Sequence, residues 1–421
     1  MALTYQQAKL VRDTVPALRE HGERISSIFY KTMLRDNPEL HNYFNTVNQK
    51  NGRQPRALTT VILAFASNIN HISELIPKLE RMCNKHCSLG IKPEQYEIVG
   101  RYLMQAFAEV LGAAWTPNVA AAWDKAYWVL AKMLIGREAQ LYKEFGPGWT
   151  GWRKFKIDRI APETDDIISF YLVPRDGRLP LPKFLPGQYV SVQVQVPEEG
   201  HLQSRQYSLS DAYNSGDCYR ITVKRDEGAQ YRNSVSTSYF HPGIVSNILI
   251  NHMRVGSLLD VSHPAGEFYL DTNSSNSSVP LVLISAGVGV TPMVSIANTV
   301  LATQPARQIS WVHVSRRVIP FQDHVAQLGR RYPETFRTHT FKTRPAAGTS
   351  EDHTYDCIGR MDLSKLNGEQ DLFLSHSGTE YYICGPEQFM VDMGTYLRGQ
   401  GVPGSRIKCE LFSTGDLAFI K

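Results

Sequence analysis

The spacing of apolar residues divides the chain into three parts, the first of which has a helical period. From Thr4 to about Phe145, apolar residues recur every three or four positions, and the alternation typical of strands is scarce. Prolines stand where helices would begin, at Pro38, Pro55, Pro93 and Pro117. The pattern predicts helices at roughly 4–20, 22–36, 55–71, 72–87, 93–111 and 117–145. These are too many and too unequal for a simple four-helix bundle, so we expect an all-α domain of a different packing.

The second part has the period of β-strands. After the Gly- and Trp-rich segment 146–152, apolar residues alternate with polar ones, most clearly over Tyr189–Val196. Turns such as Leu185-Pro-Gly187 separate the short strands. This pattern predicts an antiparallel β-barrel that continues to about Leu270, followed by the polar, low-complexity segment 272–278.

The third part alternates strands and helices. Pro280–Ser285 is a continuous apolar run typical of a buried parallel strand, and a glycine-rich turn and a helix follow it. Ile309–Val314 and Glu380–Cys384 are further predicted strands of the same parallel sheet. We therefore expect a multidomain chain with an all-α domain at 1–146, a β-barrel domain at 152–271 and an α/β domain at 279–421.

Length and composition agree with this division. A chain of 421 residues suggests about three domains. The net charge of +5 is spread along the chain, which gives no support to nucleic acid or an anionic membrane as a partner. No apolar run reaches the ~18–20 residues that cross a bilayer, and the first residues do not form a signal peptide. We expect a cytoplasmic protein without stable membrane insertion, as a monomer or a weak homodimer, whose six cysteines remain reduced.

One histidine of the helical part is a candidate metal ligand. His86 ends the apolar helical stripe formed by Ile72, Leu75, Ile76, Leu79, Met82 and Cys83. A histidine directed into an apolar pocket can ligate haem iron, whereas the alternative is a hydrogen-bonded core residue. Cys83 and Cys87 flank it, but a structural zinc site would need a fourth nearby ligand, so we interpret both as small buried hydrophobes.

The surroundings of His86 favour the haem ligand. The sequence Cys83-x-Lys85-His86-x-Ser88-Leu89 resembles the haem-binding segment of flavohaemoglobins, and the resemblance extends over nearly the whole chain. It implies a globin domain in which His86 ligates haem b beside Lys85. Tyr96 and Glu138 would support the ligand by hydrogen bonds that make the imidazole more basic, which favours oxygen activation. The opposite side of the pocket would be formed by Tyr30, Phe44, Gln54 and Leu58.

A flavin site is predicted on the barrel. In Arg205-Gln206-Tyr207-Ser208 the side chains alternate, so that Arg205 can pair with a pyrophosphate, Tyr207 can lie against the isoalloxazine ring and Ser208 can bond near its redox-active edge. Pro186-Gly-Gln-Tyr189 and Gly243-Ile-Val-Ser246-Asn resemble the FAD domain of ferredoxin reductases, in which Gly243 and Ser246 would face the pyrophosphate at a helix start. Segment 230–241 is longer than is usual in the family, and we expect an extra surface loop there.

The α/β part carries nucleotide motifs. Gly287-Val288-Gly289-Val290-Thr291-Pro292 lies between a strand and a helix, where backbone N–H groups can bind a pyrophosphate. Cys384-Gly385-Pro386 resembles the loop of ferredoxin-type reductases that approaches nicotinamide, and Glu410-Leu411-Phe412 resembles the segment beside the flavin. Ser413-Thr414 replaces the usual Gly-Pro after it. Ser315-Arg316-Arg317 can accept the 2′-phosphate of NADP, but the choice between NADH and NADPH stays open.

The resemblance to flavohaemoglobins implies a nitric oxide dioxygenase. Such an enzyme converts NO and O2 to nitrate at haem with electrons that pass from NADH or NADPH through FAD, and it detoxifies NO. Tyr30, Gln54, Tyr96 and Glu138 would be its catalytic side chains. The alternatives are a non-catalytic globin that senses or stores O2 or NO, and a flavin-dependent ferric or quinone reductase. A sensor has little use for an attached reductase.

Overall fold

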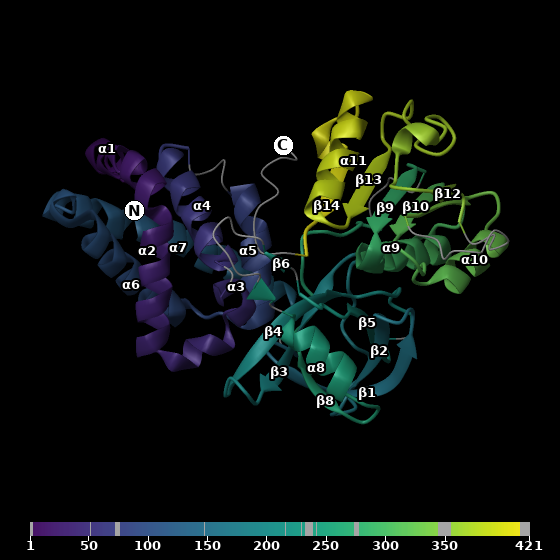
Figure 1. Ribbon diagram of the computed structural model, residues 1–421, viewed down its shortest axis with the longest axis horizontal. Coiled ribbons are helices and arrows are strands. Elements are labelled where there is room, and N and C mark those ends of the chain that lie inside the picture. The colour runs from purple at the N-terminus through teal and green to yellow at the C-terminus, as the bar shows by residue number, and fades with distance from the viewer. Residues whose placement is uncertain are drawn as a thin grey trace.

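The protein consists of a helical part, a barrel and an α/β part. The computed structural model describes residues 3–50, 52–71, 76–146, 148–214, 216–228, 230–231, 239–240, 242–272, 278–343 and 355–412. In Figure 1 the helical part, in purple and blue, lies on one side, and the teal barrel lies between it and the green and yellow α/β part. Over these ranges, no helix combines the length and the apolar character needed to span a membrane.

The helical part is all-α, as the sequence predicted. Its helices are α1 (Tyr5–Asp13), α2 (Val15–Asp36), α3 (Thr46–Lys50), α4 (Arg53–Ser67), α5 (Ile76–Leu89), α6 (Pro93–Leu111) and α7 (Pro117–Glu144), with 3-10 turns η1 (Pro38–Asn42) and η3 (Gly112–Ala114). Helix α2 packs on α4 and α6, and α7 packs on α1, α5 and α6. Pro93 and Pro117 begin α6 and α7, where their missing N–H groups need no partner.

The first helix boundary was predicted wrongly. The sequence pattern predicted that the first helix ends at residue 20 and that the second begins at residue 22. In the structure α1 ends at Asp13, and the Thr14 hydroxyl donates to the carbonyl of Val11 at 2.6 Å. Gly22 instead lies inside α2, where an added Cβ would be 2.4 Å from Cγ2 of Thr59 on α4. This glycine therefore allows two helices to pack closely. Helix α4 also ends at Ser67 rather than near 71, and Ile72 and Leu75 lie outside the described residues.

The barrel is antiparallel, as predicted. Its strands are β1 (Arg153–Pro162), β2 (Ile167–Pro174), β3 (Tyr189–Val196), β4 (His201–Ser208), β5 (Tyr219–Lys224) and β8 (Leu258–Val261), in the spatial order β4-β3-β8-β1-β2-β5. A bridge between Leu209 and Ile221 joins the two ends of this order and closes the barrel. Helix α8 (Ile244–His252) packs on β3, β4 and β5. The ends of the long segment pair as β6 (Gln230–Tyr231) and β7 (Tyr239–Phe240), and the rest of the expected loop lies outside the described residues.

The α/β part contains one parallel sheet. Its elements are β9 (Leu281–Ala286), η4 (Gly287–Gly289), α9 (Val290–Thr303), β10 (Ile309–Ser315), α10 (Gln322–Arg331), β11 (Phe336–Lys342), β12 (Cys357–Ile358), η5 (Leu363–Lys365), β13 (Glu380–Cys384), α11 (Glu387–Gly399), η6 (Gly404–Arg406) and β14 (Ile407–Glu410). The spatial order is β12-β11-β10-β9-β13-β14. Apolar clusters with α9 and α10 on one face and α11 on the other bury the sheet. The strand order reverses beside β9, which is where such sheets bind nucleotides.

Gly289 provides a test of this arrangement. A Cβ added to Gly289 would lie 2.3 Å from the backbone oxygen of Cys384, so the turn before α9 touches the end of β13. We expect Gly289→Ala to lower the free energy of unfolding by about 1–3 kcal/mol, because neither backbone can move aside easily. Gly329→Ala in α10 is the control, because a Cβ there meets open space and alanine favours a helix by up to ~1 kcal/mol. Chemical denaturation followed by circular dichroism measures both, and equal effects would contradict the close contact.

Candidate functional site

A continuous cavity of about 730 Å³ connects the helical part, the barrel and the end of β14. It brings together residues that the sequence assigned to different sites. The predicted residues that line it are Tyr30, Phe44, Gln54, Leu58, Lys85, His86, Tyr96, Tyr189, Arg205, Gln206, Tyr207, Ser208, Gly243, Ser246, Val288, Thr291, Glu410, Leu411 and Phe412. Two predicted cofactor pockets are therefore joined in one space.

His86 is held from behind by a buried carboxylate. Its Nδ1 lies 2.8 Å from Oε1 of Glu138 and 3.0 Å from the hydroxyl of Tyr96, which itself donates to the same carboxylate oxygen at 2.6 Å. Burial, followed by the charge of Glu138, raises the pKa of Tyr96 well above its usual value, so the tyrosine stays protonated. Because Nδ1 is engaged, the other ring nitrogen is left for the cavity that His86 lines. His86 therefore fits a ligand of haem iron, and Tyr96 and Glu138 fit the hydrogen-bond partners that support it.

Helix α5 has three faces with three different neighbours. Met82, His86 and Leu89 line the cavity. Cys83 and Cys87 are buried against α7, and burial raises the pKa of both thiols, which agrees with their interpretation as small buried hydrophobes.

The third face of α5 contacts the barrel. The Asn84 side-chain oxygen accepts from the backbone N–H of Gly266 at 2.9 Å. The hydroxyls of Ser88 and Ser191 lie 2.8 Å apart. Because Asn84 and Ser88 are four residues apart, both lie on the same side of the helix. The helix that carries His86 is therefore fixed directly to the barrel.

Two polar side chains, Tyr30 and Gln54, line the same cavity as His86 among mostly apolar residues. The Tyr30 ring packs edge-on against Phe44, with centroids 5.4 Å apart, and burial raises the pKa of Tyr30. The Gln54 side chain is a hydrogen-bond partner of Tyr30, while its Oε1 is buried without a partner among the described residues. An unsatisfied polar atom in a cavity indicates a place for a ligand. The pocket suits a small polar molecule.

The barrel wall presents a half-buried cation to the cavity. The Arg205 guanidinium donates to Oδ1 of Asn45 and to the backbone oxygen of Ser204, each at 2.6 Å. Over the described ranges no carboxylate forms an ion pair with it, and burial lowers its pKa. Gly243, which begins α8, also lines the cavity. A half-buried guanidinium and a helix start together fit the pyrophosphate of FAD.

A cluster of charged groups occupies the junction, and the sequence analysis identified only part of it. Burial, followed by the positive charges of Arg81 and Arg205, lowers the pKa of Lys85 to about 8. Burial, followed by the Glu267 carboxylate, raises the pKa of Glu410 to about 8. Nη2 of Arg81 donates to the backbone oxygen of Leu411, and Nε of Arg81 lies 4.0 Å from Oε1 of Glu267.

Arg81 and Glu267 were both missed, for different reasons. Arg81 precedes Lys85 by four residues, so helical spacing could have placed it on the same face of α5. Glu267 belongs to a loop without a recognisable motif, so no signal in the sequence indicated it.

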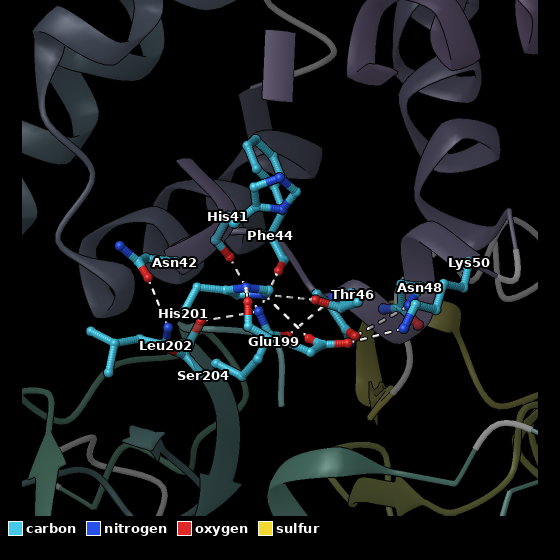
Figure 2. Close-up of polar contacts among 12 residues, drawn as sticks. His41, Asn42, Phe44, Thr46, Asn48, Lys50, Glu199, His201, Leu202 and Ser204 are labelled. Atoms are coloured by element: carbon cyan, nitrogen blue, oxygen red, sulfur yellow. Dashed lines mark hydrogen bonds and ion pairs between the residues drawn. The ribbon is translucent and has the colours of Figure 1, made fainter. Parts of the chain in front are cut away.

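Figure 2 shows a polar seam between segment 41–50 of the helical part and strand β4. The buried Gln203 side chain accepts from the Thr46 N–H at 3.1 Å and donates to the backbone oxygens of His41 at 3.1 Å and Phe44 at 3.0 Å. This one amide therefore fixes the segment that carries Phe44 into the cavity. Gln203 also precedes Arg205 on the same strand by two residues.

Ionic contacts extend the seam. Lys50 donates to Glu199 at 3.0 Å, and His201 lies 3.1 Å from the Thr46 hydroxyl (Figure 2). Burial alone would raise the pKa of Glu199, but hydrogen bonds from Lys50 and Thr46 hold it below its usual range. Burial and the nearby His201 lower the pKa of His41. The two halves thus meet through paired charges.

The nucleotide motifs lie at the far end of the cavity. Val288, Thr291 and the exposed Phe412 line it. Eight predicted site residues are outside its lining. Glu138 lies behind His86, Cys384 ends β13, and the others belong to the turns and helix starts that follow β9 and β13, namely Gly287, Gly289, Val290, Pro292, Gly385 and Pro386. Ser413 and Thr414 are outside the described residues. The structure brings Gly289 and Cys384 into backbone contact, although they are distant in sequence.

Comparisons with known proteins agree with the three parts. A family model for globins matches residues 27–134, one for an oxidoreductase FAD-binding domain matches 158–269, and one for an oxidoreductase NAD-binding domain matches 283–394. These domains define a globin joined to a flavin- and nicotinamide-dependent reductase.

Full-length relatives share this organisation. The flavohemoprotein of Bordetella parapertussis is 43% identical over 97% of this chain and 98% of its own. The crystal structure of flavohemoglobin from Malassezia yamatoensis with bound FAD and heme matches with a TM-score of 0.81 and 28% identity, over 98% of this chain and 100% of its own. The flavohem-like FAD/NAD-binding domain of nitric oxide dioxygenase from Vibrio cholerae matches with a TM-score of 0.51 and 31% identity, over 61% of this chain and 97% of its own.

The chain belongs to the flavohaemoprotein family, which confirms the resemblance found in the sequence. It is an oxidoreductase with the domains for haem, FAD and a nicotinamide nucleotide. The predicted domain limits and the roles of individual residues stay predictions.

Two substitutions test the assignment of the two cofactors to opposite walls of the cavity. We expect His86→Ala to abolish stable haem retention but to leave FAD bound, because His86 lies on the helical wall. We expect Arg205→Ala to weaken FAD binding but to spare the haem spectrum, because it removes the cation that the barrel wall presents to the cavity. Absorption spectra and cofactor content of the purified variants measure both, and each variant is the control for the other. Loss of both cofactors from either change would contradict the assignment.

Proposed function

We propose that this protein is a nitric oxide dioxygenase, which consumes NO and O2 and forms nitrate with electrons from NAD(P)H. The observation that carries the proposal is the continuous cavity, because it joins the flavin wall at Arg205–Ser208 to the pocket of His86. Haem held through His86 would supply iron that binds dioxygen, and FAD would deliver the two electrons of a hydride one at a time. Detoxification of NO and a cytoplasmic location remain part of the same proposal.

The side chains around His86 favour oxygen chemistry. Glu138 accepts hydrogen bonds from Tyr96 and from Nδ1 of His86, so its charge makes the imidazole a stronger electron donor. In the same cavity, burial keeps Tyr30 protonated, and its O–H can donate to a small ligand. Gln54 contributes a second polar group beside it. Leu58 and Phe44 exclude water from the same space.

The alternative functions explain less of the structure. A sensor or storage globin needs no continuous reduction, yet here the globin is fixed to a reductase through Asn84, Ser88 and Gln203. A ferric or quinone reductase would use the flavin half alone and would leave the Tyr30–Gln54 pocket without a role.

Tyr30→Phe tests the dioxygenase, because it removes the hydroxyl and keeps the ring. We expect NO consumption in the presence of O2 and NADH or NADPH to fall about 10- to 100-fold, because the variant loses a hydrogen bond to a partly charged ligand. Tyr102→Phe is the matched control, because its hydroxyl donates to Asp36 at 3.1 Å, away from the cavity lining. An NO electrode gives the rate, and ferricyanide reduction checks the flavin half. Slow NO loss in the wild type, or turnover unaffected by Tyr30→Phe, would contradict the proposal.

A further inference from the structure

We propose that the end of strand β10 is a 2′-phosphate site, formed by Arg316 and Arg317 after Ser315, and that NADPH is the preferred electron donor. This inference rests on the proposed function and specifies which nicotinamide nucleotide the α/β part binds. The three positions follow one another where β10 ends and the chain turns toward α10.

The position of this turn in the sheet is the first argument. In doubly wound sheets the dinucleotide lies across the carboxyl ends of the strands, with its pyrophosphate at the glycine turn after the first strand. Here that turn is Gly287–Gly289, between β9 and α9. β10 is the next strand in the chain and pairs with β9 in parallel, so its carboxyl end lies at the same edge. The 2′ position of the adenosine ribose is recognised at the end of this next strand.

The charge of the turn is the second argument. NAD enzymes place a carboxylate there, which bonds the ribose 2′-hydroxyl and repels a 2′-phosphate. In this chain the segment 315–322 contains no Asp or Glu, and the first carboxylate is Asp323 in α10. Arg316 and Arg317 are both exposed, and neither has a hydrogen bond or ion pair within the described part of the chain. Two guanidinium groups that no described residue engages suit a dianionic phosphate.

Neighbouring strands add positive charge to the same edge. Lys342 ends β11 level with Ser315, and its ammonium lies 5.0 Å from the ring centroid of Tyr355. The exposed Arg360 follows β12, the next strand of the sheet. Lys342 and Arg360 therefore place positive charge at the ends of β11 and β12, the next two strands of the sheet.

A buried histidine fixes the start of the turn. His313 Nε2 lies 2.8 Å from the Ser315 hydroxyl, and its Nδ1 lies 2.8 Å from the hydroxyl of Ser285 on β9. Burial lowers the pKa of His313 to about 3, so the ring stays neutral and connects the two strands by hydrogen bonds. The Ser315 carbonyl also accepts from the N–H of Thr343 at 3.0 Å. Arg316 and Arg317 thus extend from a point held by three strands.

The test uses the complete holoprotein and compares NADPH with NADH as the reductant of ferricyanide. We expect the wild-type kcat/KM to be about 10-fold or more higher for NADPH. Arg316→Ala with Arg317→Ala should lower kcat/KM about 100-fold for NADPH and at most about 3-fold for NADH, because only NADPH carries the phosphate. Adenosine 2′,5′-bisphosphate should inhibit the wild type more strongly than ADP, which lacks the 2′-phosphate, and the double variant should lose this difference.

Arg330→Ala is the matched control. Arg330 is an exposed arginine near the end of α10, and because α10 leads back to the start of β11, it lies toward the opposite edge of the sheet. It should leave both kcat/KM values unchanged. Ser315→Asp should reverse the preference toward NADH. A wild type that prefers NADH, or an equal loss of both activities in the double variant, would overturn the inference.

The outcome is separable from that of the proposed function. Ferricyanide reduction and inhibition by adenosine 2′,5′-bisphosphate require no NO. A protein that prefers NADPH but fails to consume NO would contradict only the dioxygenase. A protein that consumes NO but prefers NADH would contradict only the 2′-phosphate site.

Discussion

Helix α5 is the element on which the rest of the structure depends, because its three faces contact the cavity, helix α7 and the barrel at the same time. One face directs His86 into the cavity, a second buries Cys83 and Cys87 against α7, and a third binds the barrel through Asn84 and Ser88. A helix with 3.6 residues per turn can present these sets only if they recur every three or four positions. A shift by one residue would turn the imidazole away from its carboxylate and break the contact with the reductase at the same time.

The charged groups between the two halves form a second constraint. Lys85 is half-buried and Glu410 is buried at the junction, and burial moves the pKa of each toward neutrality from opposite sides. Neither charge is fully stabilised by its surroundings, so this region responds easily to a change in the charge of whatever lies beside it. A flavin that gains and loses electrons changes charge in this way. The charges of Lys85 and Glu410 can thus respond to a charge beside them, whereas hydrogen bonds hold His86, Glu138 and Tyr96 in one arrangement.

Local patterns in the sequence predicted the fold class of all three parts, and short motifs predicted fewer than half of the residues that line the cavity, because periodicity, glycine turns and motifs are properties of neighbouring residues. Gly22 shows where such reasoning fails, since a glycine permits both a helix end and a close helix contact, and only the position of Thr59 decides between them. Gln203 shows the other limit. Its partners Thr46 and Phe44 are about 160 residues away, so nothing beside it in the chain indicates that its amide joins two domains.

The contacts of Gln203 have a consequence for how this globin is compared with others. The segment from His41 to Thr46 carries Phe44 into the cavity that His86 lines, yet three of its backbone groups are satisfied by a side chain of the barrel. The wall of the cavity that contains Phe44 is therefore built by two domains. A globin fragment cut from this chain would expose those backbone groups to water and relax the wall, so its ligand affinities would describe a different pocket from the one in the intact protein.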